Sequence, residues 1–253
     1  MRRARKATIG FIAATFAFDA ARARYIWDAG GGRRPAGAVD LLQRFFAGEP
    51  FPAPGASLFM PVDWLLLILP LIGGCACVFE DLLAPRSTSR LLRVGTRRRA
   101  WIRACRALLG VAACWLAAAV ASVALVYAVE AFGGMATPQL VAAPLADGVL
   151  TVALEVSAAF LVVLLQACVS VAFGAIVGAA ASFCLAAASC VSRCVWLPHS
   201  WMMLVREPWF CAGDESSARV VAALLSTALS VALLAMGGAL FARKDLLPDR
   251  RMP

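Results

Sequence analysis

The chain has 253 residues, of which 62% are hydrophobic and only 15% are charged, with a mean hydropathy of +0.81 and a formal net charge of +9. Soluble domains carry about 25% charged residues, so this composition excludes an ordinary soluble protein and indicates an integral membrane protein. In a soluble chain such a positive charge would point to nucleic acid. Here the arginines flank apolar stretches, so membrane topology and anionic lipids explain them, and no nucleic-acid partner is expected.

Three apolar stretches predict membrane-spanning helices, because about 20 mainly apolar residues are needed to cross the hydrocarbon core of a bilayer. Residues 107–129 and 220–242 contain no charged side chain, and 58–79 contains one, Asp63. Trp64 follows it near the outer boundary of the stretch. Tryptophans of membrane proteins gather there, at the level of the lipid headgroups.

Residues 148–192 are too long for a single span and carry one charge, Glu155. Gly174 and Gly178 predict a tight turn or a close helix crossing within 170–178, so that this stretch forms two spans. The alternative is one long, strongly tilted helix.

The segment 7–27 is the weakest predicted span, since its uninterrupted apolar part is only 12 residues long. We expect it to remain attached as a first membrane helix that tilts or partly unwinds. Arg22 and Arg24 would then extend outward to water.

The distribution of basic residues decides the number of spans, because Lys and Arg are enriched on the cytoplasmic side. Residues 1–6, 80–106 and 242–253 hold 16 of the 24 basic residues, whereas 130–147 holds none. Six spans with both termini in the cytoplasm place all three basic segments inside, whereas five would put the basic C-terminal segment outside. The predicted fold class is therefore an all-α integral membrane protein with a single transmembrane domain, 1–253. Its six spans are expected at about 7–27, 58–79, 104–129, 149–170, 174–193 and 218–242.

Two further segments are expected on the outer side. Residues 28–57 are rich in Gly and Pro around an amphipathic stretch, VDLLQRFF. Residues 193–218 are rich in Trp and Met, and we expect them to lie in the membrane interface or to re-enter the membrane.

Catalytic motifs are missing from the chain. It has no G-x-x-x-x-G-K-[ST] loop for nucleotide phosphates, no H-E-x-x-H zinc motif and no G-x-S-x-G nucleophile motif. Its single histidine, His199, is more typical of a loop at the membrane interface than of a catalytic site. The nine cysteines lack the spacing of a metal site, and the seven in or at the edges of apolar spans are expected to pack between helices. The other two, Cys194 and Cys211, flank an outer loop, and a disulfide between them is the alternative to two free thiols there. We therefore expect no enzymatic activity, no metal and no cofactor in this chain.

Glu155 is the most informative ionisable residue within a span. A carboxylate there costs about 2.5–3.5 kcal/mol on insertion scales and usually faces a cavity or a partner, which makes Glu155 a candidate for a transport pathway. Asp147 lies only about two helical turns earlier, which favours a partly hydrated position near the outer leaflet. The sequence leaves both interpretations open.

The basic segment 80–106 contains eight arginines between the second and third spans. Within it, Arg90 and Arg93 enclose two leucines and precede Val94, which predicts a short amphipathic helix on the cytosolic surface of the membrane. Such a helix is either a solvated basic face in contact with anionic lipids or a docking element for a soluble partner.

Three short motifs lie in or before this segment, and a fourth closes the last predicted span. They are Asp63-Trp64, Glu80-Asp81-Leu82, Leu92-Arg93-Val94-Gly95-Thr96-Arg97 ahead of Trp101, and the closing Phe241-Ala-Arg-Lys-Asp245-Leu246. Together they resemble the permease subunits of bacterial type-2 ABC exporters. The resemblance implies a loop that couples the membrane domain to a separate cytosolic ATPase, and the amphipathic helix adds Arg90 to it. The residues that it assigns to this loop are Asp81, Arg93, Gly95, Arg97 and Trp101.

The function implied by this resemblance is that of a permease subunit of an ATP-driven exporter in the cytoplasmic membrane of a bacterium. The chain would work as a homodimer or with a sister permease, in contact with membrane lipids and with a cytosolic ABC ATPase. The alternative is a membrane accessory or assembly protein that binds a cytosolic partner without transport. A lipid-modifying enzyme would need polar residues clustered at one depth, for which only Glu130 and Glu155 are available.

Overall fold

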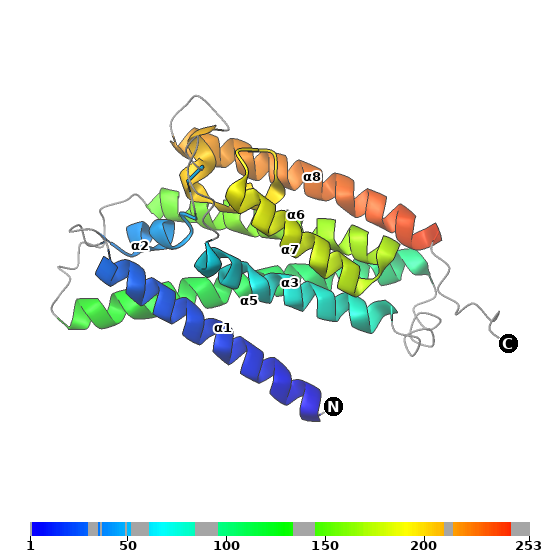
Figure 1. Ribbon diagram of the computed structural model, residues 1–253, viewed down its shortest axis with the longest axis horizontal. Helices are drawn as coiled ribbons and strands as arrows, with labels where there is room; N and C mark the ends of the chain where they lie inside the picture. The colour runs from blue at the N-terminus through cyan, green and yellow to red at the C-terminus, as the bar shows by residue number, and fades with distance from the viewer. Residues whose placement is uncertain are drawn as a thin grey trace.

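The computed structural model describes residues 2–29, 35, 37–48, 50–51, 61–83, 96–133, 145–209 and 215–243. All regular elements within these residues are helices, so the predicted all-α class is confirmed (Figure 1). In chain order they are α1 (Arg2–Ala29), α2 (Ala38–Phe45), α3 (Val62–Leu83), α5 (Arg97–Phe132), α6 (Leu145–Phe173), α7 (Ala175–Val191), η2 (Pro198–Met202), η3 (Leu204–Trp209) and α8 (Glu215–Arg243).

The six long helices run alternately in opposite directions along the long axis of the molecule (Figure 1). One end holds the beginnings of α1 and α5, the ends of α3 and α8, and the turn between α6 and α7. We call it the basic end, because the arginines of the first turn of α5 and Arg243 lie there. The opposite end, called the distal end, holds α2, η2 and η3.

Four helices are long and apolar enough to cross a membrane, namely α3, α5, α6 and α8. The chain is therefore a multi-pass membrane protein. α1 is not among the four, since Asp19, Arg22, Arg24 and Asp28 interrupt its apolar character. α7 is apolar, but its 17 residues reach only about 26 Å, less than the hydrocarbon thickness of about 30 Å.

Gly174 separates α6 from α7 and lets the chain reverse direction. Its φ of +104° belongs to a region that residues with a Cβ rarely adopt. One turn later the two helices are in close contact, since a Cβ on Gly178 would lie 2.0 Å from Ser170 Oγ. The prediction of two helices joined by a turn within 170–178 is thus confirmed, and the single tilted helix was wrong.

The interior of the bundle is tied together by polar side chains that bond to carbonyls of neighbouring helices. In α5, Trp115 Nε1 donates to the carbonyl of Leu67 at 2.8 Å. In α6, Gln166 Nε2 donates to the carbonyl of Ile72 at 2.9 Å. Both acceptors belong to α3. Interhelical hydrogen bonds in membranes contribute about 0.6 kcal/mol each, so their main effect is to define the register of the helices.

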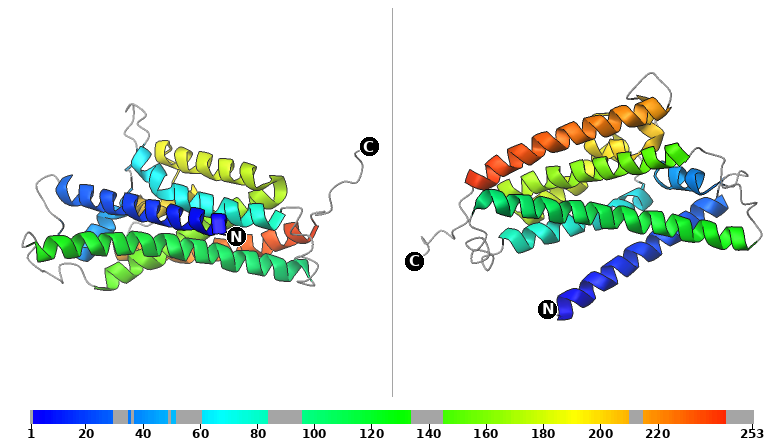
Figure 2. Two further views of the ribbon diagram at one scale, coloured as in Figure 1. Left: turned by 90° about the horizontal axis from the view of Figure 1, so that it is seen from below. Right: turned by 180° about the vertical axis from the view of Figure 1, so that it is seen from behind.

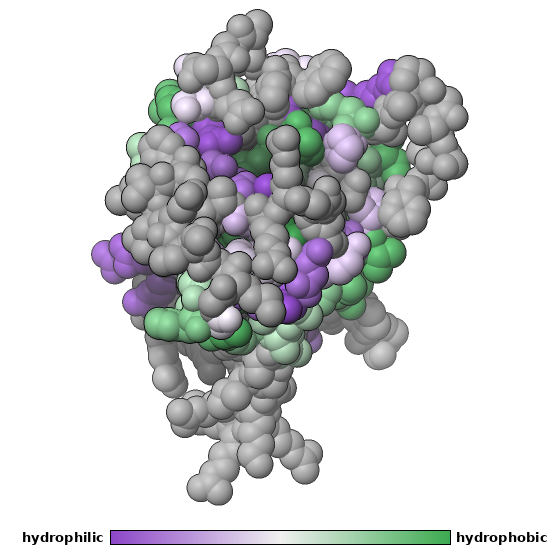
Figure 3. Space-filling view, turned by 90° about the vertical axis from the view of Figure 1, so that its left-hand side faces the viewer, coloured by the Kyte–Doolittle hydropathy of each residue, from purple (hydrophilic) through white to green (hydrophobic). Residues whose placement is uncertain are grey.

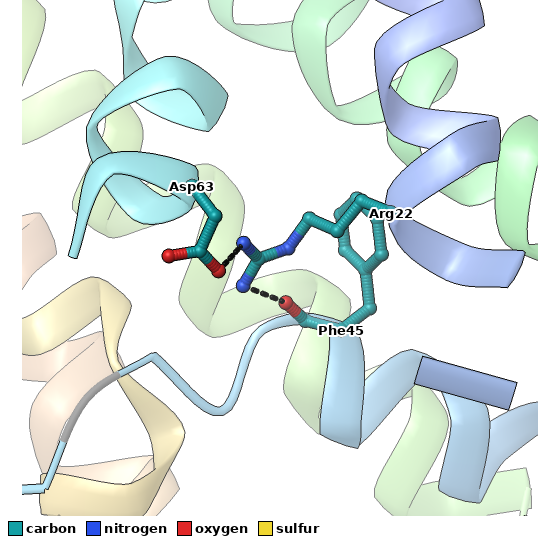
Figure 4. Close-up of polar contacts among 3 residues, drawn as sticks. All are labelled: Arg22, Phe45 and Asp63. Atoms are coloured by element: carbon teal, nitrogen blue, oxygen red, sulfur yellow. Dashed lines mark hydrogen bonds and ion pairs between the residues drawn. The ribbon is translucent and has the colours of Figure 1, made fainter. Parts of the chain in front are cut away.

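Arg22 packs into the bundle, and the prediction that it extends outward to water is wrong. It forms an ion pair with Asp63 at the start of α3 and donates to the carbonyl of Phe45 at 3.4 Å, so that its side chain is only 9% exposed (Figure 4). Its guanidinium also lies 6.0 Å from the ring centroid of Trp64. Trp64 is fully buried within the bundle.

A second ion pair fastens α1 to α5 near the distal end. Arg24 pairs with Glu130 and with Asp28, although its own side chain stays 47% exposed. Further along, Ser122 donates to the carbonyl of Phe16 at 3.3 Å. Figure 2 shows α1 beside α5 in this region and diverging from it toward the N-terminus. α1 is one continuous helix and does not unwind.

Candidate functional site

The basic segment leads directly into α5, whose first turns contain the described part of the predicted coupling loop. Thr96 has an extended backbone, and its Oγ1 accepts a hydrogen bond from the backbone N–H of Arg99 at 3.3 Å. Such a cap stabilises a helix by about 1 kcal/mol. The three arginines that follow oppose the dipole of the helix, since cations are unfavourable at its N-terminus. Their presence is therefore not explained by helix stability.

Trp101 fastens the start of α5 to α8 and α3. Its Nε1 donates to the carbonyl of Leu234 at 2.9 Å, and its side chain is only 2% exposed. The indole centroid lies 6.1 Å from the ring of Phe241 in α8 and 6.3 Å from the ring of Phe79 in α3. Gly237 makes room for it, because a Cβ there would lie 2.4 Å from Cζ2 of the indole.

Arg97 forms a second connection to α8. Its Nη1 donates to the carbonyl of Ala242 at 2.7 Å. Carbonyls in the last turn of a helix lack an intrahelical partner, and a cation there is favourable to the helix dipole. We call this assembly the basic-end junction. Its members are Phe79, Arg97, Trp101, Leu234, Gly237, Phe241 and Ala242.

The structure brings together two of the predicted coupling residues, Arg97 and Trp101. Because Trp101 is buried, it anchors the start of α5 to its neighbours and offers no surface to a soluble partner. Asp81 lies exposed in the last turn of α3. The other members of the predicted loop, with the amphipathic helix, lie outside the described residues: Arg90, Arg93 and Gly95.

Comparison with known proteins returns no family model, no curated protein and no solved structure that matches this chain. The resemblance to exporter permeases therefore depends on the short motifs around the basic segment. What those residues can do follows from their own geometry.

Glu155 lies within α6 and is fully buried in the bundle. Thr151, Gln166 and Ser170 are also buried. At about 100° per residue, these four positions fall on one face of the helix. Gln166 is bonded to α3, which shows that this polar face points into the bundle.

A small groove with a volume of about 10 Å³ lies between α6 and α7, next to this polar face. The Oε1 of Gln166 and the Oγ of Ser182 are buried beside it without a hydrogen-bond partner among the described residues. The groove is lined by Leu165, Gln166, Val169, Gly178, Ala181, Ser182 and Leu185.

Arg206, which the sequence did not single out, organises the distal end. It is fully buried, and its guanidinium donates to the carbonyls of Ser189 and Cys190 in the last turn of α7, the latter at 3.1 Å. It also donates to Ser200 Oγ at 3.2 Å and lies 4.4 Å from the ring centroid of Phe51. A cation is thus placed at the negative end of the α7 dipole, where it stabilises the helix.

The described part of 193–218 forms two short 3-10 helices folded over the distal end. Backbone hydrogen bonds join it to the segment after α2, from Leu204 N to Phe46 O and from Val205 N to Ala47 O, both at 3.0 Å. Figure 3 views this end, where hydrophilic and hydrophobic side chains lie next to one another. We call η2 and η3, with the backbone after α2 to which they are bonded, the distal cap.

His199 belongs to this cap and is fully buried beneath it. Neither ring nitrogen has a hydrogen-bond partner among the described residues. Burial lowers the pKa of the imidazole from 6.5 to about 4, so that His199 is neutral at pH 7. Within the described part of the chain, no group of three His, Cys, Asp or Glu side chains could hold a metal ion.

Proposed function

We propose that this chain is the membrane-spanning subunit of an ATP-driven type-2 ABC exporter. In this proposal it has six membrane helices, and both termini lie in the cytoplasm of a bacterium. The observation that carries the proposal is the basic-end junction. Phe79, just before the basic segment, and Trp101, near the end of that segment, pack on each other, and Trp101 is bonded to α8. A force applied to the loop therefore reaches α3, α5 and α8 together.

A separate cytosolic ATPase would bind the loop around Arg90 and Arg93 and hydrolyse the ATP. When two ATPase subunits close, they would push the loop and tilt α3 and α5 relative to α6 and α7. The bundle would then switch between two arrangements, and contacts with the ATPase would decide which of the two is more populated. The polar face of α6 with Glu155 supports a route for the substrate there, because buried carboxylates within membrane helices usually mark such routes.

Arg93→Glu tests the loop more directly than Arg97→Glu does. Arg97 also donates a hydrogen bond to the end of α8, so that its replacement would disturb packing as well as the loop. The tagged chain is co-expressed with the ABC ATPase encoded nearest to its gene and purified in detergent. Retained ATPase and the rate of ATP hydrolysis are measured. The wild type and Arg193→Glu, a charge reversal at the exposed distal end, should retain the ATPase. Arg93→Glu should lose it.

Retention of the ATPase and of full ATP hydrolysis by both Arg93→Glu and Arg97→Glu would show that the loop assignment is wrong. A second outcome favours the accessory protein. In that case the wild type binds a cytosolic partner through the loop, but the reconstituted complex hydrolyses no ATP.

A further inference from the structure

The basic-end junction fixes the depth of α5 relative to α8. Arg97 is bonded to Ala242 and Trp101 to Leu234, so the first turns of α5 lie beside the last three turns of α8. Since each residue advances about 1.5 Å along a helix, Arg106 lies about 8 Å deeper than Trp101. At that depth α8 exposes the apolar side chains Leu229 and Val231, which indicates a lipid environment at this level.

Three arginines follow one another at helical spacing on the exposed side of α5: Arg99, Arg103 and Arg106. The opposite side of these turns, with Trp101, Cys105 and Leu108, is buried against neighbouring helices. None of the three arginines forms a hydrogen bond from its side chain or an ion pair to any residue of the described ranges. Each guanidinium therefore lacks a counter-ion within the described chain.

An arginine at the depth of apolar neighbours is unfavourable unless it finds an anion or extends toward the headgroups. The phosphates of anionic lipids are available at that level and match the forked geometry of guanidinium. The same side of α5 continues with Gly110, Ala113 and Ala117, all exposed. Since these side chains are small, an acyl chain can lie close to the helix below the arginines.

We propose that Arg103 and Arg106, with Arg99 one turn nearer to water, bind the phosphate of an anionic phospholipid at the basic end. Its acyl chain lies along the small side chains of α5. A lipid is favoured over an acidic protein, because a soluble partner does not reach the depth of Arg106. The site faces away from α8 and does not depend on the proposed exporter function.

The experiment uses the full chain in neutral detergent micelles, titrated with spin-labelled phosphatidylglycerol or spin-labelled phosphatidylcholine. Electron paramagnetic resonance measures the motionally restricted, bound fraction. The wild type should bind phosphatidylglycerol more tightly. Each arginine near the membrane surface contributes about fivefold in affinity, so Arg103→Gln combined with Arg106→Gln should remove about 25-fold of that preference. Arg103→Lys with Arg106→Lys should keep most of it, because the charge remains.

Arg243→Gln is the matched control, since it removes an exposed charge at the same end on a different helix. It should leave the lipid preference unchanged. If the double Gln variant does not fold, Arg106→Gln alone carries the test, with an expected loss of about fivefold.

Three results would overturn the proposal. The first is a wild type without preference for phosphatidylglycerol; an acidic protein that it retains and the Gln variant loses would then be the ligand of the arginines. The second is a Gln variant that keeps the full preference. The third is an equal loss in Arg243→Gln, which would show a diffuse effect of net charge.

Discussion

The indole Nε1 of Trp101 donates a hydrogen bond to the carbonyl of Leu234, 133 positions further along the chain. This contact joins the first turns of α5 to the last helix of the bundle. Because the indole also packs against Phe79, the start of α5 is joined to α3 as well as to α8. Displacement of the start of α5 is therefore expected to move all three helices.

Replacement of Trp101 should separate the contribution of its ring from that of its hydrogen bond. Trp101→Ala empties a buried site and should lower the free energy of unfolding by about 3–5 kcal/mol. Trp101→Phe keeps an aromatic ring and should cost about 0.5–1.5 kcal/mol through the lost hydrogen bond. The stability of both variants is measured by thermal unfolding in detergent, in which the labelling of buried cysteines reports the unfolded fraction. Equal losses in the two variants would contradict the packing role of the indole.

Gly237 should not tolerate a methyl group, because its Cβ would lie 2.4 Å from the indole of Trp101. We expect Gly237→Ala to lower the free energy of unfolding by about 1–3 kcal/mol through overpacking. Gly110→Ala is the matched control, since a Cβ there meets nothing within 4 Å, and it should be neutral or slightly stabilising. Melting temperatures in the same detergent compare the two variants.

The Gly237 prediction has a second check in a double mutant. Trp101→Phe shortens the ring that the new methyl group would contact, so the two substitutions should cost less together than the sum of their single effects. Strict additivity would show that Gly237 and Trp101 do not press on each other.

The all-α class and the turn at Gly174 could be predicted because both depend on local signals. Long apolar stretches favour membrane helices whatever surrounds them, and glycine adopts the positive φ of the turn without strain. The exposure of single side chains was less predictable. Arg22 was expected to extend outward to water, but it pairs with Asp63 at the start of α3 and bonds to the end of α2.

Contacts between distant segments could not be predicted from one sequence. Trp101 was assigned to a coupling loop by resemblance, and nothing in the motif indicated that its indole bonds to Leu234. Arg206 was missed for a similar reason, since its partners at the end of α7 lie 16 and 17 positions away. An isolated arginine in a segment rich in Trp and Met was the only available signal.

Arg206 should be the residue on which the distal cap depends most. Arg206→Leu keeps apolar volume but leaves the carbonyls of Ser189 and Cys190 without their donor, and we expect a loss of at least about 2 kcal/mol. Arg193→Gln, at an exposed position, should change stability by less than about 0.5 kcal/mol. Maleimide labelling of the buried Cys190 reports the local effect. Unchanged labelling and melting temperature in Arg206→Leu would contradict this role.

His199 should make the stability of the cap depend on pH. Its pKa of about 4 in the folded protein lies below 6.5 in the unfolded chain, so the unfolded state binds the proton first. The contribution of neutral His199 is therefore complete above pH 6.5. It is lost as the pH falls from 6.5 toward 4, by about 1.4 kcal/mol for each pH unit. Melting temperatures of the wild type and of His199→Phe are compared at several pH values in this window.

The variant retains every other titrating group, so the difference between the two curves isolates the imidazole. We expect the melting temperature of the wild type to fall more steeply than that of His199→Phe below pH 6.5, with parallel curves above it. Curves that stay parallel down to pH 4 would show that protonation of His199 costs the folded state nothing. The imidazole would then have access to water or to an acceptor, which is incompatible with its burial beneath the cap.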